Sequence, residues 1–130
     1  MFSDGKMDDL LSMRISLLVS SKVPGREINK VVLTRSFGSG SRDGDISEVI
    51  SSINEESERL RGLLKKEGPF SNLSEEDQLS LTRMYEGEYL VKISVVDYNH
   101  LRMTFRIPLT EKYAWMFQIK ALWNMTKFKN

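Results

Sequence analysis

Few residues of this 130-residue chain have the chemistry of a catalytic centre. The single histidine, His100, could act as a general base or a metal ligand, but Asp97 is the only acidic side chain close to it in sequence. The chain has no cysteine, which excludes disulfides, thiolate nucleophiles and zinc sites of the cysteine type. We therefore expect His100 to be an exposed turn residue, and we expect no enzyme, no catalytic residue and no cofactor.

The glycine- and serine-rich segment 38–44 is the second candidate for chemistry. It lies between a predicted strand and a predicted helix start, where backbone amides can hold a phosphate. It lacks the Lys-Ser/Thr pair of a P-loop and the spacing Gly-x-Gly-x-x-Gly. Asp43, Asp45 and Glu48 could bind calcium, but acids at a helix start are also what capping requires. A flexible connector without a metal is the favoured interpretation, and an enzyme that binds a phosphorylated ligand here is the second alternative function.

The polar side of the last predicted hairpin, residues 89–109, is a better candidate for binding. Strand alternation places basic and hydroxyl side chains on one face, and such a face can bind a nucleic-acid backbone. The candidate residues for RNA or DNA binding are Lys92, Tyr98, Arg102, Arg106, Lys127 and Lys129, with Ser94 and Thr104 between them. The net charge of +1 gives no global attraction to nucleic acid, so this stays the first alternative function.

The closing segment, residues 111–126, predicts a helix that is apolar on nearly every side. Such a helix needs cover on more than one flank, either from its own domain or from a partner. Aromatic residues and methionines are enriched at the centres of interfaces. The predicted interface residues are Tyr113, Trp115, Met116, Phe117, Ile119, Leu122 and Trp123. The leading hypothesis is a non-enzymatic, self-associating binding or assembly protein, with a homodimer favoured and a protein partner as the other option.

Periodicity predicts the elements that must position these residues. Alternating residues indicate strands at 13–19 and 27–37, joined by a turn at Pro24-Gly25, and a second hairpin at 89–109. In that hairpin we expect a three-residue loop, 99–101, with Ile93 opposite Ile107. Helical spacing and caps predict helices at 45–66, 75–84 and 111–126. The order is ββααββα, an α+β fold in which antiparallel hairpins form one sheet layer covered by helices.

Length and composition bound the remaining expectations. At 15.0 kDa the chain is the size of one domain, 1–130, with a mobile N-terminal segment 1–12 and a flexible loop at 38–44. The N-terminus has no long apolar run, so we expect no membrane span, no secretion signal and a cytoplasmic location. The expected architecture resembles compact viral accessory or matrix proteins and dimeric secretion chaperones. That resemblance is architectural and implies no site residue.

Overall fold

The computed structural model describes residues 9–67 and 72–128, so the predicted contact residue Lys129 and most of segment 1–12 lie outside the described residues. In chain order the elements are β1 (Leu10–Val23), β2 (Arg26–Phe37), α1 (Asp43–Glu67), α2 (Glu75–Tyr85), β3 (Tyr89–Asp97), β4 (Arg102–Pro108) and α3 (Lys112–Trp123). The predicted α+β fold and the order ββααββα are confirmed.

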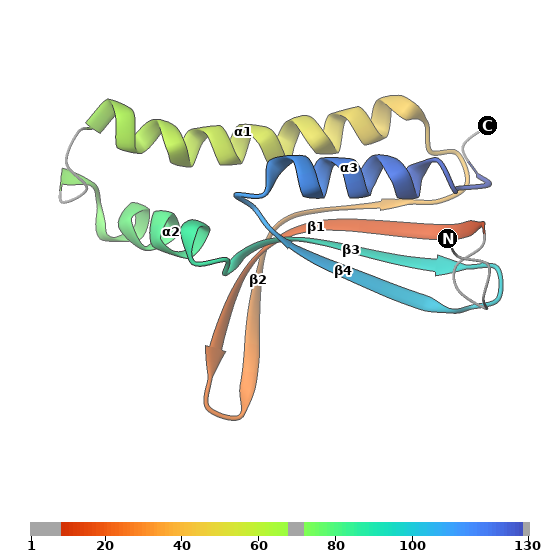
Figure 1. Cartoon of the computed structure of the whole chain (residues 1–130), viewed down its shortest axis with the longest axis horizontal. Coiled ribbons are helices and arrows are strands. Elements are labelled where there is room, and N and C mark those ends of the chain that lie inside the picture. Colours follow the sequence, from red (N-terminus) through yellow and green to blue (C-terminus); the bar gives the residue numbers. More distant parts are fainter. Residues whose placement is uncertain (1–8, 68–71, 129–130) are drawn as a thin grey trace.

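One antiparallel sheet with the strand order β2-β1-β3-β4 organises the fold. Figure 1 shows α1 and α3 side by side on one face of this sheet, with α2 beyond its end. Alternate residues of the strands, such as Ile15 of β1 and Ile93 of β3, are fully buried beneath the helices. The opposite face of the sheet has no helix over it among the described elements. This one-sided cover leaves a whole sheet face for binding.

The β1–β2 hairpin continues beyond the rest of the sheet as a two-stranded arm, residues 20–31. β1 pairs with β3 only as far as Val19, opposite Tyr89, whereas it pairs with β2 as far as Val23. The register between β1 and β2 shifts at Leu17/Leu18, which leaves Val32 as an extra residue of a β-bulge. A bulge bends and twists a strand pair. In Figure 1 the arm turns away from the helices, toward the side of the uncovered face.

The final hairpin forms with a different register from the expected one. Ile93 lies opposite Phe105, not Ile107, so the expected register is wrong by two residues, although the apolar residues still share one face. The reason is the turn. The carboxylate of Asp97 accepts hydrogen bonds from the backbone N–H groups of Asn99 and Leu101, at 2.9 Å each, which closes the loop one residue earlier. His100 takes the left-handed conformation that such a loop requires, with φ of 64°.

The helix starts follow their capping chemistry in part. Ser74 caps α2 by accepting a hydrogen bond from the N–H of Asp77 at 3.1 Å, as its sequence predicts. α1 begins two residues before the expected start, at Asp43. α3 is shorter than predicted, and Glu111 precedes it without a side-chain cap. None of the helices in residues 9–67 and 72–128 is both long and apolar enough to cross a membrane.

Candidate functional site

The uncovered face of the sheet is hollowed and polar. Its main hollow has a volume of about 620 Å³ and lies over all four strands. The lining residues come from all four strands: Ser12, Met13, Arg14, Ser16 and Leu18 from β1, Asn29, Val31, Thr34, Ser36 and Phe37 from β2, Lys92, Ser94 and Val96 from β3, and Arg102 from β4. We call this surface the open face.

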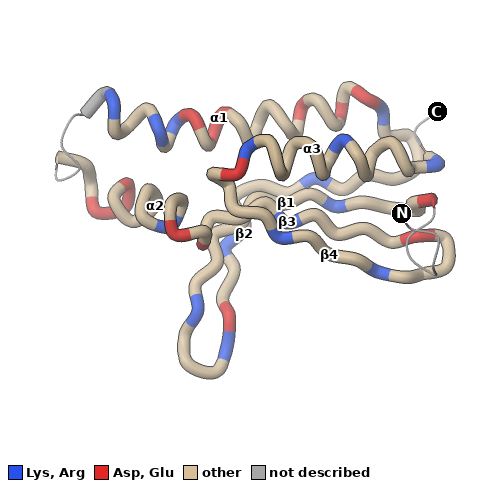
Figure 2. The backbone as a smooth tube through the Cα atoms, in the orientation of Figure 1, with Lys and Arg blue, Asp and Glu red and all other residues tan. Residues whose placement is uncertain are grey.

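Three cations of the open face form no ion pair among the described residues. These cations are Arg14, Lys92 and Arg102, and the Nε–H of Arg14 donates to the Ser36 hydroxyl at 3.2 Å. Figure 2 shows basic positions on neighbouring strands of the sheet, whereas acidic positions gather on the helices, the arm and the strand ends. Unpaired cations that line one concave surface attract a polyanion.

Three acidic residues, Glu27, Glu86 and Glu88, line the arm end of the open face, and Glu27 is the one that contacts its basic residues. Its carboxylate accepts hydrogen bonds from the Ser20 hydroxyl at 2.7 Å and from Arg106 at 2.8 Å. The Ser20 hydrogen bond and the charges of Arg106, Lys22 and Lys92 lower the pKa of Glu27. Glu27 therefore stays ionised at neutral pH, and it neutralises part of the basic charge beside the arm. A smaller hollow of about 310 Å³ lies here.

The remaining lining of the open face consists of hydroxyl, amide and apolar side chains. Ser16 and Thr34 share a hydrogen bond of 2.8 Å across β1 and β2, and Leu18, two residues further along β1 on the same face, is buried. The aromatic residue in the lining, Phe37, is itself buried. Base recognition in single strands uses exposed aromatic rings. The open face instead offers charges and hydroxyls, which suit phosphate oxygens.

The structure brings together half of the predicted nucleic-acid residues. Lys92 lies directly opposite Arg106, and Arg102 opposite Val96, so all three basic side chains project from one face. Tyr98 lies in the turn beyond the strand ends, 52% exposed. Lys127 follows α3 and forms an ion pair with Asp9 at 3.1 Å.

Sequence reasoning missed the contribution of the first hairpin to this surface. Arg14, Ser16 and Thr34 join the open face because β1 lies between β2 and β3. The signal was present, since Arg14 and Ser16 alternate with the buried residues Met13, Ile15 and Leu17.

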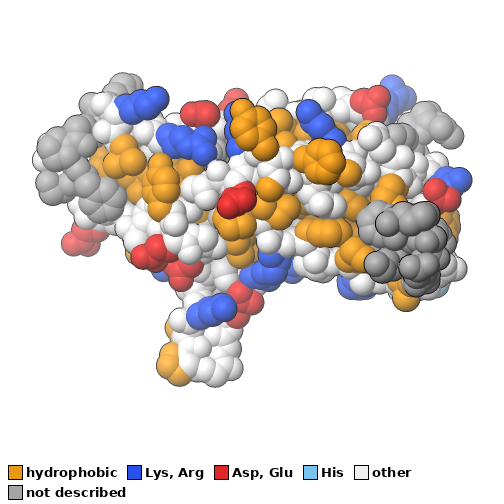
Figure 3. All heavy atoms as spheres, in the orientation of Figure 1, with side chains coloured by type: hydrophobic (Ala, Val, Ile, Leu, Met, Phe, Trp, Pro, Cys, Tyr) orange, Lys and Arg blue, Asp and Glu red, His pale blue; other side chains and the backbone are white. Residues whose placement is uncertain are grey.

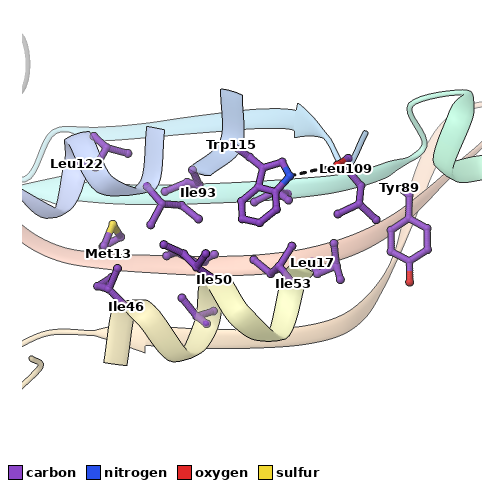
Figure 4. Packing of buried hydrophobic residues seen from close by; sticks show 14 of the residues in the cluster. Met13, Leu17, Ile46, Ile50, Ile53, Tyr89, Ile93, Leu109, Trp115 and Leu122 are labelled. Atoms are coloured by element: carbon purple, nitrogen blue, oxygen red, sulfur yellow. Dashed lines mark hydrogen bonds between the residues drawn. The ribbon is translucent and has the colours of Figure 1, made fainter. Parts of the chain in front are cut away.

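The predicted interface residues of α3 divide between core and surface. Trp115, Ile119, Leu122 and Trp123 are buried within the chain itself. Figure 4 shows Trp115 pointing into the core, where its indole N–H donates to the Leu109 carbonyl at 3.2 Å. Tyr113 and Phe117 are 84% and 72% exposed, and Met116 is half-buried beside Asn54 of α1. Of the seven predicted interface residues, only Tyr113, Met116 and Phe117 are accessible enough to contact a partner of the folded chain.

The polar groups of the loop at 38–44 and of the helix start that follows it bind to neighbouring residues of the chain. The Asp45 carboxylate accepts the N–H of Arg42 at 2.9 Å and pairs with Arg35, which also pairs with Glu48. The Trp123 indole N–H donates to Asp43 at 2.7 Å and joins this loop to α3. Carboxylates at this helix start repel a phosphate. Within the described residues no cluster of histidine and acidic side chains is arranged to hold a metal.

His100 lies on the exposed tip of the β3–β4 turn, as expected. The carboxylate of Asp97 is directed to the turn amides and orients the backbone rather than the imidazole. This arrangement gives the imidazole no carboxylate partner among residues 9–67 and 72–128.

A second titratable cluster joins α1 and β3. The Tyr89 hydroxyl donates to Glu56, which also accepts from Arg59 at 2.9 Å. The hydrogen bond from Arg59 lowers the pKa of Glu56 most, and the hydrogen bond from Tyr89 lowers it further. Burial and the Glu56 contact raise the pKa of Tyr89 far above its ordinary value. Every member is paired within the cluster, so it stabilises the packing of α1 on the sheet.

Comparison with protein-family models, with curated protein sequences and with solved structures finds no match. The site is therefore interpreted from its own geometry.

Proposed function

We propose that the protein is a non-enzymatic nucleic-acid-binding protein that contacts the phosphate backbone through its open face. The observation that carries this proposal is the set of three unpaired cations, Arg14, Lys92 and Arg102, on one concave, uncovered sheet surface. A cation that forms no ion pair within the chain gains more binding free energy from an added anion than a cation that is already paired. A backbone with regularly spaced phosphates satisfies several such cations at once.

The lining of the open face also supports sequence-independent binding. Hydroxyl groups from Ser12, Ser94 and Thr34 can donate to phosphate oxygens, and such contacts position a nucleic acid without reading its bases. No exposed aromatic ring lies among the residues that line the hollow. We therefore expect binding to duplexes at least as strong as binding to single strands, with little preference for sequence.

Fluorescence anisotropy with labelled DNA and RNA oligonucleotides, single- and double-stranded, tests the proposal. The expected result is binding at about 50 mM salt that weakens steeply as salt rises, because each neutralised phosphate releases a counterion. Anionic lipid vesicles and heparin serve as competitors that distinguish nucleic acid from any polyanion. The absence of binding to all four oligonucleotides at low salt would contradict the proposal.

Self-association through α3 is the second candidate, and a separate observation favours it. Tyr113 and Phe117 are the most exposed of the large apolar side chains described. Figure 3 shows hydrophobic side chains gathered over α3 and β4 on this side of the molecule. Light scattering coupled to size exclusion, over a range of concentrations, measures whether this surface joins two copies. A mass of 15.0 kDa at every concentration would reject it.

A further inference from the structure

The outer edge of β4 has backbone groups that pair with no strand among residues 9–67 and 72–128. β4 is an end strand of the sheet, and the N–H of Leu109 and the carbonyl of Leu101 bond to β3. Along an antiparallel strand the bonding direction alternates with each residue. The backbone groups of Arg102, Thr104 and Arg106 therefore point outward from the sheet. A further β-strand that pairs with this edge would form hydrogen bonds with these outward-pointing N–H and C=O groups.

We propose that two copies of this chain pair β4 with β4 in antiparallel fashion around a two-fold axis at Phe105. This inference rests on the self-association offered above as the second candidate function. An isologous contact of this kind uses one surface twice, so the same strand must complement itself. The sequence of β4 is complementary to itself when the two-fold axis passes through Phe105.

In that register each residue of β4 meets a suitable residue of the second copy. Thr104 lies opposite Arg106 of the other copy, and these are the residues whose backbone groups point outward. Met103 lies opposite Ile107, and Phe105 meets its own equivalent. These three side chains are half-buried on the helix side of β4, so pairing would complete their burial.

The neighbouring register explains why Phe105, and not Thr104, marks the axis. An axis at Thr104 would place Arg102 directly opposite Arg106, and like charges directly opposite destabilise a strand pair. An axis at Phe105 places Arg102 opposite Pro108 instead. Pro108 lacks an N–H, so one hydrogen bond is lost on each side, but its carbonyl still accepts.

Helix α3 fits the same arrangement. Figure 4 shows α3 on the side of the sheet nearest β3 and β4, with α1 over the other two strands. With strands about 4.8 Å apart, a helix above β3 and β4 would lie about 10 Å from its symmetry mate, the distance of packed helices. Helical spacing puts Ala114, Gln118 and Ala121 on the flank away from Met116, which contacts α1. The small side chains of Ala114 and Ala121 on that flank allow the close approach, with Phe117 beside them.

The opposite edge strand, β2, is a poorer candidate for such pairing. It carries the bulge at Val32 and bends into the arm, and both features protect an edge from straight pairing. β4 pairs with β3 without a shift in register. A β4 dimer would also join two open faces into one continuous basic surface.

Cysteine cross-linking tests the geometry, because the chain has no cysteine of its own. Directly opposite residues of a non-hydrogen-bonded pair have Cα atoms about 4.5 Å apart, within disulfide range. Phe105→Cys should give a disulfide-linked dimer on mild oxidation. Val31→Cys, on β2 and 54% exposed, is the matched control and should stay monomeric on a non-reducing gel.

A second variant keeps the test valid if Phe105→Cys does not fold. Thr104→Pro removes an N–H that bonds to no described residue of the monomer, so it should leave the chain folded and weaken dimerisation by about tenfold or more. Light scattering of the unmodified chain separates the two proposals. A mass that never exceeds 15.0 kDa rejects self-association altogether. A dimer that resists Thr104→Pro, or that cross-links at Val31→Cys instead, rejects β4 pairing and leaves self-association intact.

Discussion

Lys92 and Arg106 lie directly opposite each other on β3 and β4, with both side chains on the open face. Like charges in this position destabilise a strand pair. Arg106 forms an ion pair with Glu27 at 2.8 Å, whereas Lys92 acts on the same carboxylate without forming an ion pair among the described residues. Repulsion between two cations on an uncovered surface is typical of a binding site, because a bound polyanion relieves that repulsion. This relationship supports the interpretation of the open face as a phosphate-binding surface.

The first prediction concerns the unpaired cations. Replacing both Arg14 and Arg102 by Ala should weaken duplex binding about uniformly across sequences, because phosphate contacts do not read bases. The slope of log affinity against log salt should become shallower by roughly 0.9 for each lost phosphate contact. Lys120→Ala, an exposed change on α3, is the control and should leave the slope unchanged. Anisotropy titrations at several salt concentrations measure both quantities.

The second prediction concerns the acid on the same face. Glu27→Gln should raise the affinity for nucleic acid several-fold, because it removes a repulsive charge and frees Arg106. The pKa of Glu27 is lowered, so the gain should stay constant from neutral to mildly acidic pH. Glu55→Gln, exposed on α1, provides the matched loss of one negative charge elsewhere. Equal gains from both variants would show a general charge effect instead of a local one.

The third prediction separates two neighbours on α3. Trp115→Ala should reduce the free energy of unfolding by about 3–5 kcal/mol, because the indole is fully buried and its N–H bonds to Leu109. Phe117→Ala should change that free energy by less than about 0.5 kcal/mol when the protein is dilute. Urea unfolding followed by fluorescence measures both. A large cost for Phe117→Ala at low concentration would place this side chain in the core of the chain itself.

The fourth prediction concerns pH and the cluster of Tyr89, Glu56 and Arg59. The pKa of Glu56 is lower in the folded chain than in the unfolded one, so its contribution to stability is present above the unfolded pKa and is lost as pH falls through the folded pKa. Glu56→Gln should therefore cost about 1 kcal/mol at neutral pH and progressively less below about pH 4. Glu58→Gln is the control, since its side chain is 61% exposed. A cost of Glu56→Gln that does not change with pH would argue against this linkage.

Much of the fold follows from local patterns in the sequence. The alternation in 13–19 and 89–95, the Ser74 cap and the Pro24-Gly25 turn predict their elements because each depends on a few adjacent residues. The hairpin register was not predictable from hydrophobic alternation alone. Two registers keep the apolar face together, and the Asp97 carboxylate selects between them through hydrogen bonds to the turn.

The candidate site was predictable only in part, because it is a tertiary feature. Lys92, Arg102 and Arg106 belong to one hairpin, so alternation places them together. Arg14 joins them only because β1 inserts between β2 and β3, which no local pattern specifies. On α3, an apolar pattern on all sides does not distinguish Trp115, buried by the sheet, from Phe117, which no described element covers.

The most direct test of the central claim is a map of backbone amide chemical shifts during titration with a short duplex. If the open face binds the duplex, the largest chemical-shift changes will be at the open-face residues Arg14, Ser16, Lys92 and Ser94, and the amides of α1 will scarcely change. Changes centred on the helices, or no changes at low salt, would contradict the central claim.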